Sequence, residues 1–147
     1  AILNGLELAG KHIANAKIVT SGAGAAALAC LNLLVGLGAK RENIFVTDLE
    51  GVVYEGRTVL MDRWKAVYAQ HTPARSLAEV IGSADVFLGL SAAGVLKPEL
   101  LKSMAAKPMI MALANPVPEI MPDLARQERP DAMICTGRSE PLLMVIV

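Results

Sequence analysis

The sequence predicts an α/β fold in which a doubly wound, mostly parallel sheet is flanked by helices. Two observations carry this prediction. Short apolar segments that favour strands alternate with helical segments along the chain, which is typical of α/β domains. The first apolar segment also runs directly into a Gly-x-Gly-x-x-Ala turn that opens a helix, as in a parallel βαβ unit.

The expected elements follow from the apolar patterns and from the residues that begin and end them. Strands are expected over residues 17–20, 44–47, 86–90, 109–113 and 132–135. Helices are expected over residues 1–14, 25–37, 61–70, 76–81, 97–104 and 121–127. Ser76 and Glu79 form a capping-box pattern, Pro98 stands at an early helical position, and Gly38 ends the second helix. Residues 49–60 are rich in turn formers and are expected to be a loop.

The first strand, its turn and the second strand carry the most specific pattern in the chain. Gly22 permits a tight turn, Gly24 lets a pyrophosphate approach the backbone, and Ala27 lets helix and strand pack closely. The helix that follows offers N–H groups and a partial positive charge to phosphates. The second strand ends in Asp48, 21 residues after Ala27, where an acid can accept hydrogen bonds from a ribose. Together these features predict a Rossmann-type dinucleotide site rather than a glycine-rich turn without a nucleotide.

The bulk composition fits one domain with an aliphatic core. The chain has 147 residues, of which 54% are hydrophobic and only 3% aromatic. Its 14 basic residues balance 14 acidic ones, so charge gives no support for binding to nucleic acid or to a membrane surface. Cys30 and Cys135 lie in apolar segments without metal-ligand spacing, and we expect two buried, reduced thiols in a cytoplasmic protein.

The apolar stretch over residues 22–39 has nearly the length of a membrane span. Asn32 is its single polar residue, but its many glycines and alanines make transfer into a bilayer only weakly favourable. We therefore interpret it as a helix that packs on the sheet beneath another layer, and no membrane partner is expected. No secretory signal is apparent at the start of the chain, which begins at Ala1 without Met and is interpreted as a fragment.

Polar or glycine-rich segments follow each expected strand. They comprise residues 21–27, Asp48, and residues 89–94, 114–119 and 136–139. In an open parallel sheet, ligands bind in the crevice outside the carboxyl ends of the strands. We therefore expect these five segments to converge on one site.

Five motifs in and around these segments resemble the cofactor-binding domain of bacterial malic enzymes. They read Ser-Gly-Ala-Gly-Ala-Ala, Asn-Ile-Phe-Val-Thr-Asp-x-x-Gly-Val, Asp-Val-Phe-Leu-Gly-Leu-Ser-Ala-Ala-Gly, Ala-Leu-Ala-Asn-Pro-x-Pro-Glu and Thr-Gly-Arg-Ser, in chain order. The resemblance covers about residues 1–139. It implies that residues 1–147 form one NAD(P)-binding Rossmann domain whose catalytic partner domain is absent, with residues 140–147 atypical of the family.

The resemblance also implies a function for the intact protein and roles for residues of this chain. Malate would be oxidised and decarboxylated to pyruvate and CO₂ with NAD or NADP and with Mg²⁺ or Mn²⁺. Asp48 would lie beside the adenosine ribose, Ser91 and Ala92 would line the nicotinamide side, and Asn115 would contact the substrate carboxylate. Taken alone, Asn115 and the proline after it would simply start a turn. The cofactor-binding set that the resemblance implies is Gly22, Gly24, Ala25, Ala26, Asp48, Ser91, Ala92 and Asn115.

Catalytic and metal-binding residues are not expected in this chain. The resemblance places the family's catalytic Tyr and Lys and its three acidic metal ligands before Ala1. The isolated chain is therefore expected to bind cofactor without turning over malate, and the intact enzyme to be a homo-oligomer. The acids Glu119, Asp123 and Asp131 are interpreted as helix caps or solvent-facing groups.

The choice between NAD and NADP stays open from the sequence. Asp48 favours NAD, because a carboxylate repels a 2′-phosphate, although family members that use NADP also carry this acid. Lys65 resembles a position that contacts the 2′-phosphate in some NADP-using members. Arg57 and Lys65 are equally compatible with solvated surface charges.

Two other functions fit part of the pattern. A non-catalytic regulatory module that binds a dinucleotide would use the same crevice. An amino-acid or folate dehydrogenase fits the glycine motif but not Ala-Asn-Pro-x-Pro-Glu. Residues 140–147 replace a polar loop of the family, which carries another substrate Asn, by an apolar segment suited to strand pairing.

Overall fold

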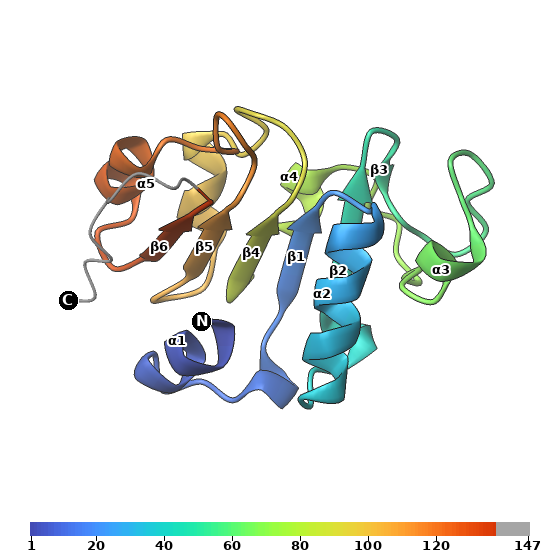
Figure 1. The fold of residues 1–147 in the computed structure, drawn as a ribbon, viewed down its shortest axis with the longest axis horizontal. Coiled ribbons are helices and arrows are strands. Elements are labelled where there is room, and N and C mark those ends of the chain that lie inside the picture. Colours follow the sequence, from blue (N-terminus) through green and yellow to red (C-terminus); the bar gives the residue numbers. More distant parts are fainter. Residues whose placement is uncertain (138–147) are drawn as a thin grey trace.

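Six strands form one sheet in the order β3-β2-β1-β4-β5-β6 (Figure 1). The computed structural model describes residues 1–137. The strands are β1 (Ile18–Ser21), β2 (Ile44–Asp48), β3 (Gly51–Val52), β4 (Val86–Gly89), β5 (Met109–Ala112) and β6 (Met133–Thr136). All neighbouring strands are parallel except β3, which runs antiparallel to β2. The doubly wound, mostly parallel α/β fold expected from the sequence is thereby confirmed.

The register of the central strands explains why they are apolar along their whole length. Ile18 of β1 lies between Ile44 of β2 and Val86 of β4. All three side chains are fully buried, and they belong to a core on one face of the sheet. The next residues along these strands turn to the other face, where Val19 and Phe87 are also fully buried. A sheet covered on both faces requires continuous apolar strands rather than alternating ones.

Helices cover both faces of the sheet. The helical elements are α1 (Ile2–Leu8), η1 (Ile13–Asn15), α2 (Ala25–Gly36), η2 (Arg41–Asn43), α3 (Arg63–Ala66), α4 (Leu77–Val80), η3 (Pro98–Ser103) and α5 (Pro122–Glu128). Leu6 of α1 and Leu31 of α2 enter one core, whereas Val80 of α4, Leu101 of η3 and Ala125 of α5 enter the other. The crossovers therefore place helices on both faces, as a doubly wound sheet requires.

Several expected helices are shorter in the structure, for identifiable reasons. The helix expected over residues 1–14 is divided into α1 and η1, because Gly10 follows α1 with a φ of +70°. The helix expected over residues 61–70 is reduced to α3, which begins where the Asp62 side chain accepts hydrogen bonds from two backbone N–H groups. The helix expected over residues 97–104 is the 3₁₀ helix η3, and the Arg129 side chain binds the carbonyls of Leu101 and Met104 at its end.

The expected loop over residues 49–60 contains the short strand β3. Gly51 opens β3 with a φ of +85°, and a Cβ added there would lie 1.9 Å from the carbonyl oxygen of Arg75. The Val52 N–H donates to the same carbonyl at 2.9 Å. Two residues are too few to show a strand pattern in a sequence, and glycine is typical of loops, so this edge strand was not predictable from periodicity.

The helix α2 is buried on one side only. Ala27, Leu28, Leu31 and Leu34 form its sheet-facing stripe. Cys30 lies off this stripe and is exposed, so the expectation that this thiol is buried is wrong for the chain as described. Within residues 1–137, no helix combines the length and the apolar character that a membrane crossing requires. The atypical residues 140–147 lie outside the described residues.

Candidate functional site

The strand order of the sheet reverses between β1 and β4, and this reversal defines a crevice. From β1 the chain continues to β2 on one side, and after β4 it continues to β5 and β6 on the other (Figure 1). The loops that leave β1 and β4 therefore diverge at the carboxyl edge of the sheet. Ligands of open α/β sheets bind at such a switch point.

The turn after β1 is shaped by two glycines with different surroundings. Gly22 has a φ of +110°, and a Cβ added there would lie 2.5 Å from the carbonyl oxygen of Leu90, at the end of β4. Gly24 caps α2 with an ordinary φ of −81°, and a Cβ added there would meet no atom within 4 Å. The first glycine thus permits close approach of the two loops, while the second borders open space at the N-terminus of a twelve-residue helix.

The residues expected to cradle a pyrophosphate lie together at this helix end. Gly24, Ala25 and Ala26 are exposed, whereas Ala27 is buried against the sheet. Small residues on the exposed turn leave backbone N–H groups accessible, which is what an anion at a helix N-terminus needs. The geometry fits the phosphates of a dinucleotide.

The loop after β4 is tied directly to the end of β1. The hydroxyl oxygens of Ser21 and Ser91 lie 2.6 Å apart, and the Leu90 N–H donates to the carbonyl of Ser21 at 2.8 Å. Ser91 and Ala92 are both exposed beside this contact. The structure therefore brings the expected nicotinamide-side residues next to the glycine turn.

Asn115 lies on the third loop of the crevice edge, three residues after β5 ends at Ala112. It is exposed, while Ala114 is buried. Gly137 follows β6 on the next loop, and a Cβ added there would lie 2.8 Å from the carbonyl oxygen of Leu113. The loops after β1, β4, β5 and β6 therefore share one edge, as expected, although residues 138 and 139 of the last motif lie outside the described residues.

Asp48 at the end of β2 is held by two buried cations. Its Oδ2 accepts hydrogen bonds from Arg57 Nη2 at 2.5 Å and from Lys65 Nζ at 2.7 Å, and its Oδ1 accepts one from the Glu50 N–H at 2.9 Å. Arg57 and Lys65 are only 7% and 6% exposed. The interpretation of these two residues as solvated surface charges is therefore wrong, because both are buried and paired with a carboxylate that has also left water.

This cluster determines the protonation of Asp48. Burial raises the pKa of the carboxyl group, but hydrogen bonds from Arg57, Lys65 and the Glu50 backbone outweigh burial and hold the pKa below its ordinary value. Asp48 is therefore a carboxylate at neutral pH. Three of its roughly four lone-pair positions are occupied, so about one remains for a ribose hydroxyl.

Arg57 also fixes the segment around β3. Its guanidinium donates to the carbonyls of Gly51, Val52 and Val59, at 3.1, 3.0 and 3.0 Å. A rigid fork of five donors can satisfy these three carbonyls together with Asp48, whereas a lysine has only three donors for the four acceptors. The contacts hold the β3 segment beside Asp48.

Glu119 ends one of the segments expected at the crevice, but its role there was not expected. The sequence interpretation made it a helix cap or a solvent-facing group, but its side chain is fully buried between the loops that follow β4 and β5. Asp123 does face solvent beside Arg126, and Asp131 binds Arg129 and the Lys107 N–H. The sequence signal that could have singled out Glu119 is its place as the last residue of the Ala-Leu-Ala-Asn-Pro-x-Pro-Glu motif, which begins at the end of a buried strand.

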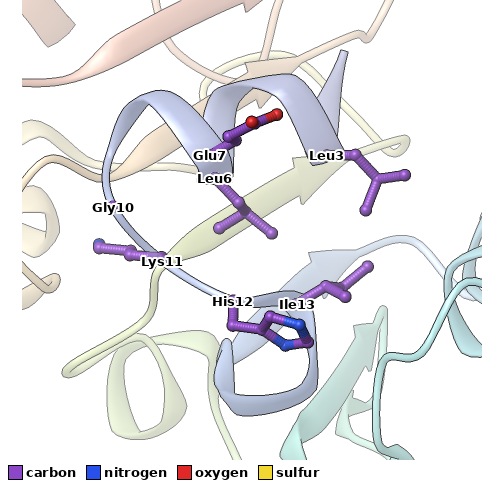
Figure 2. A pocket seen from close by; sticks show the side chains of 7 residues that line it. All are labelled: Leu3, Leu6, Glu7, Gly10, Lys11, His12 and Ile13. Carbon is purple, nitrogen blue, oxygen red and sulfur yellow. The ribbon is translucent and has the colours of Figure 1, made fainter.

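A separate hollow of about 510 Å³ lies beside α1 (Figure 2). α1 lies at the amino end of the parallel strands, opposite the carboxyl edge that carries the crevice (Figure 1). Lys11 near this hollow contacts Asp85, which precedes β4, and the carbonyl of Ala106, which precedes β5. None of the expected site residues lines it. The hollow is lined by Leu3, Leu6, Glu7, Gly10, Lys11, His12 and Ile13.

Metal-binding geometry is absent from the described part of the chain. Over residues 1–137, no three His, Cys, Asp or Glu side chains are grouped so that they could hold a metal ion. His12 instead accepts the Ala14 N–H, and His71 lies 3.1 Å from Glu55 on the surface.

The glycine turn, the carboxyl-edge loops and the acid after β2 agree with one known family. The sequence pattern of the malic enzyme NAD-binding domain matches residues 1–139. The chain belongs to the malic enzyme family. The resemblance drawn from the five motifs is thereby confirmed, as is the expectation of a domain that binds NAD or NADP.

Individual malic enzymes are highly similar to this domain. The chain is 77% identical over 140 residues to an NAD-dependent malic enzyme of Rhizobium meliloti and 55% identical over 141 residues to an NADP-dependent malic enzyme of Escherichia coli. Each match covers 95% of this chain but only 18% and 19% of the two relatives. The chain thus spans about a fifth of the length of these curated malic enzymes.

Solved malic enzyme structures share the fold. The NAD-dependent malic enzyme of Thermotoga maritima superimposes with a TM-score of 0.85 at 36% identity, over 95% of this chain and 37% of that one. A glutamate dehydrogenase of Thermus thermophilus superimposes with a TM-score of 0.66 at 17% identity, over 92% of this chain and 33% of that one, which shows a shared fold alone. The close relatives carry NAD-dependent and NADP-dependent names alike, so cofactor choice has to be argued from the site.

Proposed function

We propose that this chain is the cofactor-binding domain of a malic enzyme that oxidises and decarboxylates malate to pyruvate and CO₂. The observation that supports it most is the crevice between the loops after β1 and β4, with open space at Gly24 and a neutralised acid at Asp48. The nicotinamide of a bound cofactor accepts the hydride from malate. The domain's own part is to bind the dinucleotide and to orient it toward the substrate.

The residues divide this task along the carboxyl edge of the sheet. The turn at Gly22 and Gly24 and the N-terminus of α2 would hold the pyrophosphate, and Asp48 would lie beside the adenosine ribose. Ser91 and Ala92 would face the nicotinamide, and Asn115 would bind the substrate carboxylate. The catalytic Tyr and Lys and the ligands of Mg²⁺ or Mn²⁺ would come from parts of the enzyme outside residues 1–147.

Binding without turnover is the behaviour proposed for this chain alone. Calorimetric titration with NAD⁺ and NADP⁺ tests it, with a Gly24→Ala variant as the probe of the crevice. A methyl at Gly24 meets no protein atom within 4 Å, so the variant should fold normally yet weaken cofactor binding by about tenfold or more. Gly82→Ala is the matched control, because its added methyl also meets no atom and lies before β4, away from the crevice. Unchanged affinity in Gly24→Ala, or no binding by the wild type, would refute the proposal for this chain.

A regulatory module that only binds a dinucleotide is the second candidate, because it would use the same crevice. Turnover separates the two. A full-length protein that contains this domain should reduce NAD⁺ or NADP⁺ in the presence of malate and a divalent metal ion, whereas a regulatory protein should bind cofactor without reducing it. We further propose a cytoplasmic homo-oligomer, which cell fractionation and sedimentation of the full-length protein would check.

A further inference from the structure

Glu119 carries a buried carboxylate that joins two loops of the crevice. The Ser91 N–H, after β4, donates to Oε1 at 2.9 Å, and the Ala114 N–H, after β5, donates to Oε2 at 3.0 Å. The residue is 0% exposed. One side chain therefore binds the main chain of both the loop with Ser91 and Ala92 and the loop with Asn115.

Only an acceptor with two oxygens satisfies both loops. Two backbone N–H groups point at the Glu119 carboxylate, and each needs an acceptor in the absence of water. A glutamine has one acceptor oxygen, and its NH₂ group would face the second donor. Within residues 1–137 the carboxylate forms no ion pair with lysine, arginine or histidine, and it accepts hydrogen bonds from the Ser91 and Ala114 N–H groups. The charge is thus used for hydrogen bonding between loops.

The Glu119 carboxylate packs closely against Gly89. A Cβ added at Gly89 would lie 2.4 Å from the Glu119 Cδ and 2.7 Å from each of its oxygens, so the glycine makes room for this group. The main chain is also fixed, because Leu96 N–H donates to the Glu119 carbonyl at 3.1 Å and Gly94 N–H to the Pro118 carbonyl at 3.3 Å. Movement of the carboxylate would therefore move the loops with it.

We propose that Glu119 is a positioning residue that sets the nicotinamide-side loop against the substrate-side loop of the crevice. The inference rests on the proposed function, which assigns Ser91 and Ala92 to the nicotinamide and Asn115 to the substrate. Hydride transfer requires the two reacting carbons to be held in close contact, and a displacement of about 1 Å can reduce the rate about a hundredfold. A residue that fixes the distance between the two loops should therefore affect kcat more than it affects binding of the adenosine half of the dinucleotide.

The test uses Glu119→Gln in a full-length malic enzyme that contains this domain. ADP-ribose probes the pyrophosphate and adenosine half, since it lacks nicotinamide, and NAD⁺ probes the whole cofactor. We expect the ADP-ribose dissociation constant to stay within about twofold, while kcat for malate oxidation falls at least about tenfold. Glu99→Gln is the matched control, because Glu99 is an exposed carboxylate on η3, and it should leave both quantities unchanged.

Gly89→Ala provides a second, independent variant. Its methyl would displace the Glu119 carboxylate without removing it, so kcat should fall again with ADP-ribose binding retained. Normal kcat in a folded Glu119→Gln protein would overturn the positioning role. A parallel loss of ADP-ribose affinity and kcat in both variants would also overturn it, because that result indicates general destabilisation. Failure of the wild type to bind ADP-ribose would instead refute the proposed function itself.

Discussion

The ammonium group of Lys65 lies 2.7 Å from the carboxylate of Asp48, and both side chains are more than nine-tenths buried. Lys65 Nζ also donates to the carbonyl of Leu60 at 2.6 Å. The lysine is therefore engaged as a counter-ion inside the domain. A 2′-phosphate would have to compete with Asp48 and the Leu60 carbonyl for this ammonium group.

This arrangement predicts that the domain prefers NAD⁺ to NADP⁺ and that Lys65 stabilises the fold rather than selecting the cofactor. Lys65→Gln should reduce the free energy of unfolding by about 1–3 kcal/mol, because Asp48 keeps Arg57 but loses one of its two cations. The ratio of NAD⁺ to NADP⁺ affinity should not change. Chemical denaturation and calorimetric titration measure the two quantities, with the exposed Lys40→Gln as control. Unchanged stability with a selective loss of NADP⁺ binding would show that Lys65 is free to bind phosphate.

Asn115 is exposed on the loop that Glu119 holds, and its proposed partner is the substrate carboxylate. In a full-length malic enzyme that contains this domain, Asn115→Ala should raise the malate KM about tenfold or more, since a hydrogen bond to a charged group is lost. The effect on cofactor affinity should be smaller. Steady-state kinetics with malate varied at saturating cofactor measures the change. Val117→Ala, an exposed substitution on the same loop, is the control, and an unchanged malate KM in Asn115→Ala would refute the substrate role.

The parts of the fold that were predictable from sequence are those with a strong local pattern. Continuous apolar runs marked the five parallel strands, and the glycine motif marked the turn at Gly22, because buried strands and tight turns restrict residue type directly. The ends of the helices were less predictable, since they depend on tertiary contacts such as the Arg129 side chain at the end of η3. The strand β3 has two residues and leaves no periodic signal.

The candidate site was predictable where backbone shape is involved and not where side chains pair across the fold. The positions of Gly24 and Ser91 at one edge follow from strand order alone. The burial of Lys65 and Glu119 does not follow from strand order, because it depends on partners that are distant in the sequence. Asp48 lies 17 residues from Lys65, and Ser91 lies 28 residues from Glu119. A charged residue in a sequence is far more often solvated than buried, and only the three-dimensional contacts reverse that expectation.

Two glycines at the end of α2 should respond in opposite ways to alanine. Gly36 is the last helical residue, its φ is not positive, and an added Cβ would meet no atom within 4 Å. Gly36→Ala should therefore stabilise the domain by about 0.5–1 kcal/mol and raise Tm by about 2–4 °C. Gly38 has a φ of +113°, so Gly38→Ala should lower Tm instead. Thermal unfolding followed by circular dichroism measures both, and equal shifts in the two variants would contradict the backbone argument.

Asp131 predicts a specific acid dependence of stability. Its Oδ1 accepts Arg129 Nε at 2.9 Å, and its Oδ2 accepts Arg129 Nη2 at 3.0 Å and the Lys107 N–H at 2.7 Å. The hydrogen bonds from Arg129 lower the pKa of Asp131 from 3.8 to about 2. Between these values the unfolded chain binds more protons than the folded one, so stability falls as pH decreases through this window. The contribution is fully present above the ordinary pKa.

The Tm difference between the wild type and Asp131→Asn should therefore be constant from about pH 7 to pH 5 and should shrink as the pH falls below about 4. Thermal unfolding in a series of buffers of equal ionic strength measures it. Asp123→Asn is the matched control, because Asp123 is exposed and forms only a 3.5 Å contact with Arg126. The Tm difference between the wild type and Asp123→Asn should therefore be small at every pH. A Tm difference between the wild type and Asp131→Asn that stays constant to the lowest pH at which both proteins fold would contradict this prediction. It would show that the charge of the Asp131 carboxylate does not stabilise the fold through Arg129 and the Lys107 N–H.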